Sequence, residues 1–228
     1  MGAGGLGHPA IAGLADLDVD LTLFDDDRVE QSNLHRLPFA NDGDVGQWKL
    51  EVAQRVLSGE RATLRSARRE RVLPVNALEA LAGHDLVIEG ADNYPSKFLV
   101  ADACALLGIP SVHGAALGWT ATILVTQPFE TACYRCVFET PPEGEALNCA
   151  SAGIFAPVAT LAGALMAVEA ARWISGDRTN AGTILSIDGW RGRARSIHLR
   201  RRPDCPLCGI RAIRSLREDL YVAQPCDA

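Results

Sequence analysis

Two Cys-x-x-Cys pairs constrain the fold of this chain more than any other feature of its sequence. They are Cys133 with Cys136 and Cys205 with Cys208, at a separation of 205 − 136 = 69 positions, so the fold must bring distant segments together. Four thiolates can close a tetrahedral zinc site in which every ligand is a protein side chain. Such a site leaves no position for a substrate, so we expect a structural zinc. A redox dithiol and unrelated free thiols are the alternatives.

The other cysteines carry weaker signals. Paired cysteines in a chain without a visible signal peptide are typical of metal binding in the cytoplasm rather than of a disulfide framework. Cys104 is expected to pack in a helix and Cys226 to lie in a loose tail. Cys149 precedes a predicted helix and could be a nucleophile, although its local chemistry favours a small buried residue.

Composition and charge exclude several classes of protein. With 48% hydrophobic residues the chain can bury a sizeable core, which excludes a disordered chain. The formal net charge of −6 counts against binding to nucleic acid or to an anionic membrane. The uncharged stretches 103–129 and 146–168 contain proline and other polar interruptions, so we interpret them as buried soluble segments. The arginine-rich stretches 61–71 and 191–202 are interpreted as solvated faces or contacts to an acidic partner.

The first half of the chain alternates helical and strand patterns, as α/β proteins do. The pattern predicts helices over 9–17, from a cap at Asp44 to about residue 57, and over 97–107, and strands over 21–25, 85–89 and after Gly108. Beyond Gly118 it predicts strands over 120–126, 183–188 and 194–199 and a helix over 157–173. No linker separates two halves, so we expect one domain over residues 1–228 with a tail at 210–228.

A glycine-rich loop opens the chain. Gly2, Gly4 and Gly7 form G-x-G-x-x-G ahead of a predicted helix, and Asp25 ends the next predicted strand. Glycines let the backbone approach a phosphate, the helix N-terminus offers N–H donors, and an acid in this place can bond a ribose hydroxyl. This combination favours a nucleotide site over the alternative of a glycine-rich turn with a capping aspartate.

Further polar residues follow the predicted strands. Asn33, Arg36 and Lys49 lie within a short window after Asp25, where an arginine fork and a lysine charge could hold phosphate oxygens. Each basic residue alone would usually be a solvated surface charge. Asp92 and Asn93 follow another strand, at the end of the sheet where ligand sites form. A carboxylate there could carry Mg²⁺, and a helix N-cap or turn is the alternative.

Taken together, these motifs resemble the ThiF/MoeB/HesA family, bacterial relatives of the ubiquitin-activating enzymes. The matching segments, in family order from residue 2 to residue 208, are GAGGLG, LTLFDDDRVEQSNLHR, VGQWK, a strand ending in Gly-Ala-Asp-Asn, CYRC, NCASAGIFAPV and CPLC. The resemblance implies an α/β fold: a Rossmann-like sheet with helices on both faces, a mixed-sheet extension and a four-cysteine zinc knuckle.

The resemblance also implies ATP-dependent adenylation of the C-terminal Gly-Gly carboxylate of a small ubiquitin-like sulfur carrier. It implies a catalytic group of Arg36, Lys49, Asp92 and Cys149, with Asp92 positioning Mg²⁺ and Cys149 matching a cysteine that links covalently to the carrier in some members. The ATP-binding set carried over from the family motifs is Gly2, Gly4, Gly5, Gly7, Asp25, Ser32, Asn33, Arg36, Lys49, Asp92 and Asn93.

The family further implies a cytoplasmic homodimer with no nucleic acid or membrane partner, and it leaves the carrier's pathway, thiamine or molybdopterin, open. Members carry a helical segment and an apolar strand before the glycine motif, so we expect the natural start to lie upstream of Met1. Two other functions remain: an inactive member that binds a carrier or partner protein, and an NAD-dependent oxidoreductase built on the same glycine loop.

Overall fold

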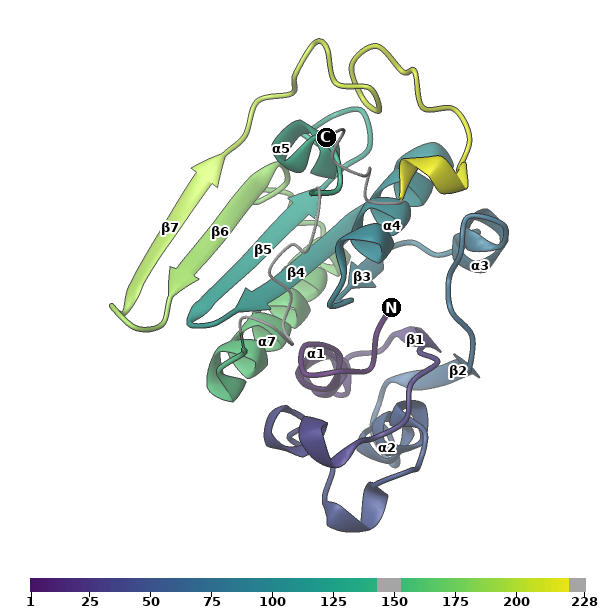
Figure 1. The fold of residues 1–228 in the computed structure, drawn as a ribbon, viewed down its shortest axis with the longest axis vertical. Helices are drawn as coiled ribbons and strands as arrows, with labels where there is room; N and C mark the ends of the chain where they lie inside the picture. Colours follow the sequence, from purple (N-terminus) through teal and green to yellow (C-terminus); the bar gives the residue numbers. More distant parts are fainter. Residues whose placement is uncertain (143–152, 222–228) are drawn as a thin grey trace, which may run out of the picture.

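Two sheets lie side by side in the computed structural model, which describes residues 1–142 and 153–221. The smaller sheet pairs β1 (Asp20–Phe24) in parallel with β2 (Thr63–Arg68). The larger has the order β3-β4-β5-β6-β7, in which only the β3–β4 pair is parallel (Figure 1). Its strands are β3 (Val87–Glu89), β4 (Ser111–Leu117), β5 (Thr120–Thr126), β6 (Thr183–Asp188) and β7 (Arg193–His198).

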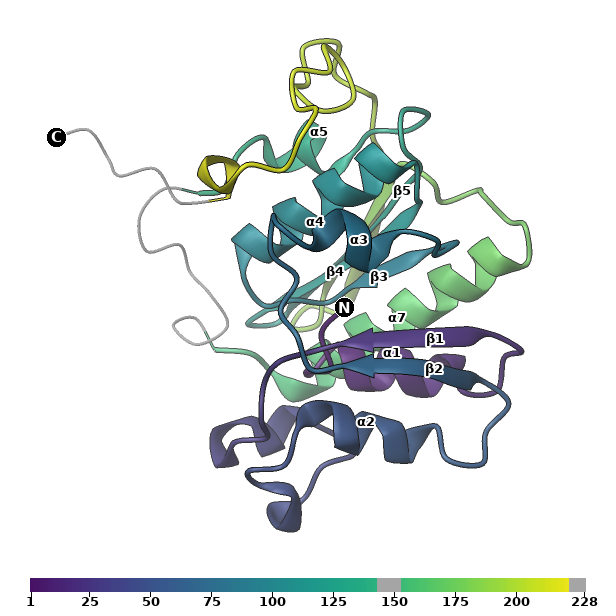
Figure 2. The same cartoon turned by 90° about the vertical axis from the view of Figure 1, so that its right-hand side faces the viewer.

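Helices cover both faces of the larger sheet, as the family resemblance implied (Figure 2). Alternation along β5 explains this: Ile123 and Val125 belong to the core under α7, whereas Leu124 belongs to the core under α4. The α-helices are α1 (Gly7–Leu14), α2 (Lys49–Val56), α3 (Ala77–Leu81), α4 (Tyr94–Leu107), α5 (Tyr134–Phe138) and α7 (Ala156–Ile174). Short 3₁₀ helices are η1 (Gln31–Arg36), η2 (Asp42–Asp44) and η3 (Glu218–Leu220).

The start of the chain lies between the two sheets. The Met1 amine donates to the Ile88 carbonyl at 3.0 Å, Gly90 N–H donates to the Met1 carbonyl at 3.1 Å, and Gly2 N–H donates to the Phe24 carbonyl at 2.9 Å. β1 and β3 do not pair with each other, and a cavity of about 110 Å³ separates them. Residues 1–2 therefore connect the carboxyl ends of β1 and β3, where the glycine loop begins.

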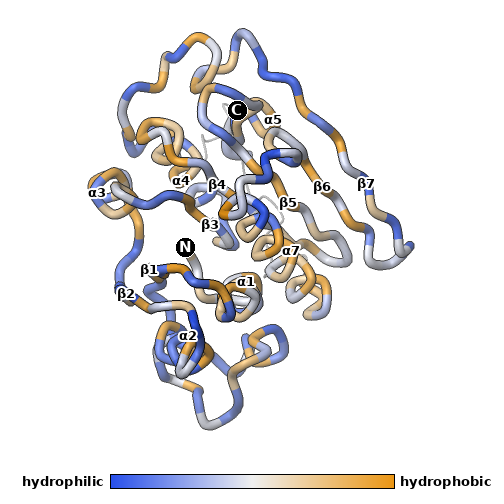
Figure 3. The backbone as a smooth tube through the Cα atoms, turned by 180° about the vertical axis from the view of Figure 1, so that it is seen from behind, coloured by the Kyte–Doolittle hydropathy of each residue, from blue (hydrophilic) through white to orange (hydrophobic). Residues whose placement is uncertain are grey.

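Helix α7 is the one helix in the described part of the chain that is long and apolar enough to cross a membrane. It packs instead against α1, β4 and β5, and Ala159, Ala162 and Met166 on its inner face are fully buried. Figure 3 shows that hydrophobic residues gather along both α7 and α1. These contacts identify α7 as a core helix, which agrees with the interpretation of 146–168 as a buried segment over its described part, 153–168.

Several sequence-based expectations were wrong in detail: the helix expected over 9–17 is Gly7–Leu14, and the short helices α3 and α5 were not expected. The helix expected from Asp44 begins at Lys49, because Asp44 ends η2, where its carboxylate accepts from the Asn41 N–H at 2.9 Å and pairs with Arg55 at 2.7 Å. Strand β2 was missed, since it lies inside the arginine-rich stretch 61–71. That stretch is an exposed edge strand whose Arg65 pairs with Asp20 at 2.6 Å, so its charges face solvent while its backbone extends the sheet.

Candidate functional site

The glycine loop turns tightly into the N-terminus of α1. A side chain on Gly7 would overlap the carbonyl oxygen of Gly2, so the two ends of the loop can approach only because residue 7 is glycine. Around Gly4 there is open space instead. The loop thus presents bare backbone at the start of a helix, the arrangement that suits an anionic phosphate.

Asp25 follows β1 directly and organises this loop. Its carboxylate accepts from the backbone N–H of Ala3 at 2.6 Å and of Asp27 at 2.8 Å. Burial raises the pKa of Asp25 above its ordinary value, and the hydrogen bond from Ala3 and the charge of Lys49 offset only part of that rise. The two hydrogen bonds from Ala3 and Asp27 fix the carboxylate beside the glycine loop.

Helix η1 places Arg36 against the same loop. A Cβ on Gly5 would lie 3.1 Å from the Arg36 carbonyl oxygen and 3.5 Å from two carbons of its side chain. The guanidinium of Arg36 donates weakly to the Ser32 carbonyl at 3.4 Å, which leaves most of its N–H donors for other acceptors. Asn33 is buried beside it and donates to the Ser32 hydroxyl at 2.9 Å.

Lys49 approaches from the first turn of α2. The residue is 8% exposed, and its ammonium donates to Asp27 at 2.6 Å at the edge of the cavity described below. Asp27 itself is exposed, so water can solvate its carboxylate if the Lys49 ammonium turns to another partner. Lys49 is therefore a cation held at the cavity by a partner that an incoming anion can replace.

Asp92 and Asn93 lie beyond the carboxyl end of β3, and their roles differ. The Asn93 side chain accepts from the Ser96 N–H at 2.9 Å and caps α4, which is the structural alternative that the sequence left open for this dipeptide. Asp92 is exposed, and its carboxylate accepts a long hydrogen bond of 3.5 Å from the Asn93 amide. This carboxylate is available to a ligand.

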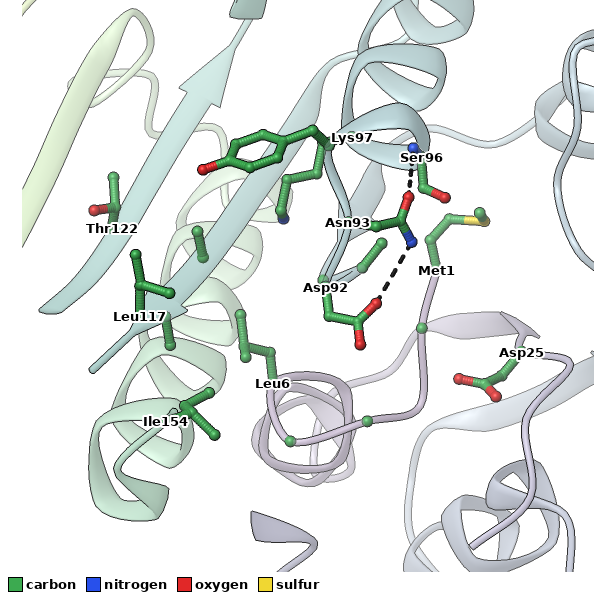
Figure 4. Close-up of a pocket in the computed structure, with 18 of the residues that line it drawn as sticks. Met1, Leu6, Asp25, Asp92, Asn93, Ser96, Lys97, Leu117, Thr122 and Ile154 are labelled. Atoms are coloured by element: carbon green, nitrogen blue, oxygen red, sulfur yellow. Dashed lines mark hydrogen bonds between the residues drawn. The ribbon is translucent and has the colours of Figure 1, made fainter. Parts of the chain in front are cut away.

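These side chains surround one cavity of about 610 Å³. Figure 4 shows Asp92 and Asn93 between Asp25 on one side and Leu117 and Thr122 of the larger sheet on the other. The nucleotide-site residues predicted from the sequence that line it are Gly2, Gly4, Gly5, Asp25, Asn33, Arg36, Lys49, Asp92 and Asn93. Ser32 and Gly7 do not line it, and Cys149 lies outside the described residues.

The cavity continues into a groove that the sequence did not reveal. It crosses the part of the α4-facing side of the larger sheet that α4 does not cover, and we call this part the sheet groove. Its lining residues include Ala115, Leu117, Thr120, Thr122, Ile154, Ile184, Ser186 and Ile197. On β4 and β5 the members alternate at every second position, but only the pairing register shows which strands lie side by side.

The two cysteine pairs meet, as the zinc hypothesis requires. The Sγ atoms of Cys133, Cys136, Cys205 and Cys208 all lie within 4.8 Å of one another. Three of the Sγ–Sγ distances are 3.8, 3.6 and 3.3 Å. A tetrahedral zinc with bonds of about 2.3 Å separates its sulfurs by about 3.8 Å. The cluster therefore fits a four-sulfur metal site.

Comparison with known proteins identifies the family of this chain and supports its fold. The sequence model of the ThiF family matches residues 1–207. A sulfur carrier protein adenylyltransferase of Thermus thermophilus is 39% identical over 218 residues, covering 92% of this chain and 80% of that protein. The sulfur carrier protein ThiS adenylyltransferase of Escherichia coli is 36% identical, covering 92% and 84%, and the SAMP-activating enzyme E1 of Haloferax volcanii is 36% identical, covering 99% and 84%.

Among solved structures, Escherichia coli MccB with ATP superposes with a TM-score of 0.78 at 23% identity. The match covers 91% of this chain and 65% of MccB, and at this identity it supports the fold alone. The chain belongs to the ThiF family.

Proposed function

We propose that this chain catalyses ATP-dependent adenylation of the C-terminal carboxylate of a small ubiquitin-like sulfur carrier and releases pyrophosphate. One observation carries the proposal: a single cavity joins the glycine loop, Arg36, Lys49 and Asp92 to an open groove across the sheet. Relatives that cover most of the chain are named sulfur carrier protein adenylyltransferases, which supports the same reaction class.

In this proposal each side chain has a part in holding ATP. Asp25 accepts hydrogen bonds from the ribose, and the backbone of Gly4 and Gly5 faces the phosphates. Arg36 and Lys49 neutralise phosphate charge once Lys49 exchanges Asp27 for the nucleotide. Asp92 would hold Mg²⁺, which supplies further neutralisation of the triphosphate when bound. The available carboxylate of Asp92 suits an oxygen-binding cation.

The reaction needs positioning and charge stabilisation rather than proton transfer. An oxygen of the carrier's terminal carboxylate forms a bond to the α-phosphorus, and the bond from that phosphorus to the bridging oxygen of pyrophosphate breaks. The products are an acyl-adenylate and pyrophosphate. Arg36 and Lys49 act by stabilising charge on the phosphates as the leaving group departs.

The sheet groove is the path proposed for the carrier's C-terminal tail. Its lining combines the small or hydroxyl-bearing side chains of Ala115, Thr120, Thr122 and Ser186 with the apolar side chains of Leu117, Ile154, Ile184 and Ile197. We propose that the small residues leave room for an extended backbone with little side-chain volume, which a Gly-Gly terminus has. Whether Cys149 links covalently to the carrier stays a prediction, and so do the cytoplasmic location and the homodimer.

The two other functions fit the site less well. An inactive binding protein has no need of Arg36, Lys49 and Asp92 around one cavity, and the relatives do not favour it. An oxidoreductase gives no role to Lys49 or to the Asn33–Arg36 segment, and the family assignment does not support it.

Carrier-dependent ATP–pyrophosphate exchange tests the proposal. The purified chain should incorporate labelled pyrophosphate into ATP when supplied with a ThiS- or MoaD-type carrier that ends in a free Gly-Gly. A carrier lacking its last glycine is the matched control and should give background exchange. A folded protein that binds carrier and ATP without exchange would instead support the inactive binding protein.

The raised pKa of Asp25 predicts how ATP binding depends on pH. Only the ionised carboxylate accepts hydroxyl hydrogen bonds at both oxygens, so ATP affinity should fall as the pH decreases through the raised pKa of Asp25. In Asp25→Asn the fall should be smaller, because only the phosphates of ATP still titrate, and the affinity at neutral pH should be lower by about tenfold. Titration with a fluorescent ATP analogue measures both.

Folding stability should change in the opposite direction. A carboxyl whose pKa is raised in the folded state binds more protons there than in the unfolded chain, so Asp25 contributes stability that increases as pH falls through the raised pKa. Loss of ATP affinity on acidification is therefore separable from unfolding. An identical pH profile for Asp25→Asn and wild type would contradict the assigned role.

A further inference from the structure

We infer that Glu89, paired with Lys97, is a positioning residue that holds the Gly90–Asp92 loop in place through the backbone of Ala91. Glu89 is the last residue of β3 and has no exposed surface. One of its carboxylate oxygens accepts from the Ala91 N–H at 2.6 Å. Because Asp92 is the next residue, this hydrogen bond fixes the backbone that carries the proposed Mg²⁺ ligand.

The charge of Glu89 is held by groups from two other elements. Lys97 of α4, only 6% exposed, donates to both carboxylate oxygens at 3.1 and 3.3 Å and to the Gly114 carbonyl of β4 at 2.5 Å. His113 Nδ1 lies 3.3 Å from the same carboxylate. Burial alone would raise the pKa of Glu89, but Lys97 and His113 outweigh it and the pKa is lowered.

The hydrogen-bond network continues along the face of the larger sheet that packs against α4. His113 Nε2 lies 2.8 Å from the Ser111 hydroxyl, which lies 2.8 Å from the Thr126 hydroxyl of β5. Each polar atom named here has a partner, which is the condition under which a buried network fixes one geometry. The loop before Asp92 is thereby connected to β4 and β5, two of the strands that form the sheet groove.

A buried ion pair is seldom retained for stability alone, since an apolar pair of similar volume is often equally stable. In this chain the pair supplies something that an apolar pair lacks, an acceptor for Ala91. The loop could otherwise turn this N–H toward water and move Asp92 with it. Glu89 does not line the cavity, so it acts on the proposed reaction through Ala91 and Asp92, whereas Lys97 also lines the cavity.

The test removes the ion pair without leaving an unpaired charge. Glu89→Leu/Lys97→Met removes the acceptor, whereas Glu89→Gln/Lys97→Met restores an acceptor without the charge. Hydrogen exchange of the Ala91 amide in the whole chain should quicken by about tenfold or more in the leucine variant and return to within about threefold of wild type in the glutamine variant. This readout does not depend on activity, so it decides the inference even if the proposed function fails.

A second readout rests on the proposed function. In the leucine variant the kcat of carrier-dependent exchange should fall by about tenfold or more, with a higher Mg²⁺ concentration for half-maximal rate and an unchanged KM for carrier. The glutamine variant should recover most of the kcat.

The matched control is Asp102→Asn/Arg135→Gln, which alters another buried ion pair anchored on α4, with a 2.8 Å contact. It should change the melting temperature without quickening exchange at Ala91. The inference is wrong if the leucine variant keeps wild-type protection at Ala91, or if the glutamine variant restores nothing at an equal melting temperature.

Discussion

Replacing Asp92 by alanine should lower carrier-dependent ATP–pyrophosphate exchange by about two to three orders of magnitude and leave the melting temperature unchanged. The activity falls because Asp92 is the carboxylate proposed to hold Mg²⁺ at the triphosphate, whereas the other carboxylates that line the cavity follow β1 and β2: Asp25, Asp26, Asp27 and Glu70. Stability is unaffected because the side chain is exposed and makes only a 3.5 Å contact with Asn93. Exchange kinetics and thermal unfolding of the same preparation measure the two effects.

Asp85→Ala is the matched control for this prediction. Asp85 is also an exposed aspartate, but it lies before β3 rather than after it and does not line the cavity. Its replacement should change neither exchange nor melting temperature. Wild-type exchange in Asp92→Ala would remove Asp92 from the mechanism, whereas a large drop in melting temperature would assign it a structural role.

The sequence predicted those parts of the molecule that depend on short-range signals. The Thr120–Thr126 strand matches its predicted bounds because a β-branched run needs no tertiary context. The meeting of the two cysteine pairs was also expected, since ligand chemistry requires it. The predicted start of α2 was wrong because the Asp44 carboxylate has other partners. An aspartate can cap a helix that begins just after it, but here the Asn41 N–H and Arg55 occupy this carboxylate.

The parts that were missed depend on how strands lie beside one another. The sheet groove exists because α4 covers only part of one sheet face, and no local pattern reports what a distant helix leaves open. Likewise Glu89 and Lys97 carry no distinguishing signal in the sequence and become a buried pair only when α4 packs over β3 and β4. Strand β2 was missed because its arginines resemble a solvated surface until β1 pairs with it.

In this fold the Asn93 side chain acts as a helix cap, which is one of the two roles that the sequence left open for it. Its carboxamide caps α4, and this cap directs the first turn of the helix, which contains Lys97, toward Glu89. Asp92, the preceding residue, keeps its carboxylate available. The sequence could not tell which of Asp92 and Asn93 caps the helix and which is free to bind a ligand. In the structure Asn93 is the cap and Asp92 is available to a ligand.

Removing one sulfur of the cysteine cluster should have the largest effect on stability. We expect the wild-type chain to bind one equivalent of zinc and Cys205→Ser to bind none and to melt about 10 °C lower or more. Cys205 is fully buried in a small core with Leu207 and Ile213, which packs around the cluster. Without the metal, that core must hold the segment after β7 through apolar contacts alone. Metal analysis and calorimetry test the prediction.

The loss should spread from the cluster toward the sheet. Cys133 is followed by Tyr134, which packs edge-on against Phe98 of α4 and lies 5.1 Å, ring to ring, from His113. Arg135, between the two cysteines of this pair, donates to the buried Asp102 of the same helix. A metal that fixes this turn therefore holds α4 from its outer side, so ordered contacts of Phe98 should weaken when the zinc is lost.

Cys104→Ala is the matched control, because Cys104 is equally buried in α4 but lies outside the cluster. It also removes one sulfur, yet it should retain one zinc and lose only the small stability expected of a minor core truncation, about 1 kcal/mol. Full zinc content in Cys205→Ser, or a wild-type chain that folds at the same temperature with and without a chelator, would contradict a structural zinc. A disulfide formed reversibly between these thiols would favour the redox alternative instead, since closed zinc sites keep all four sulfurs as thiolates.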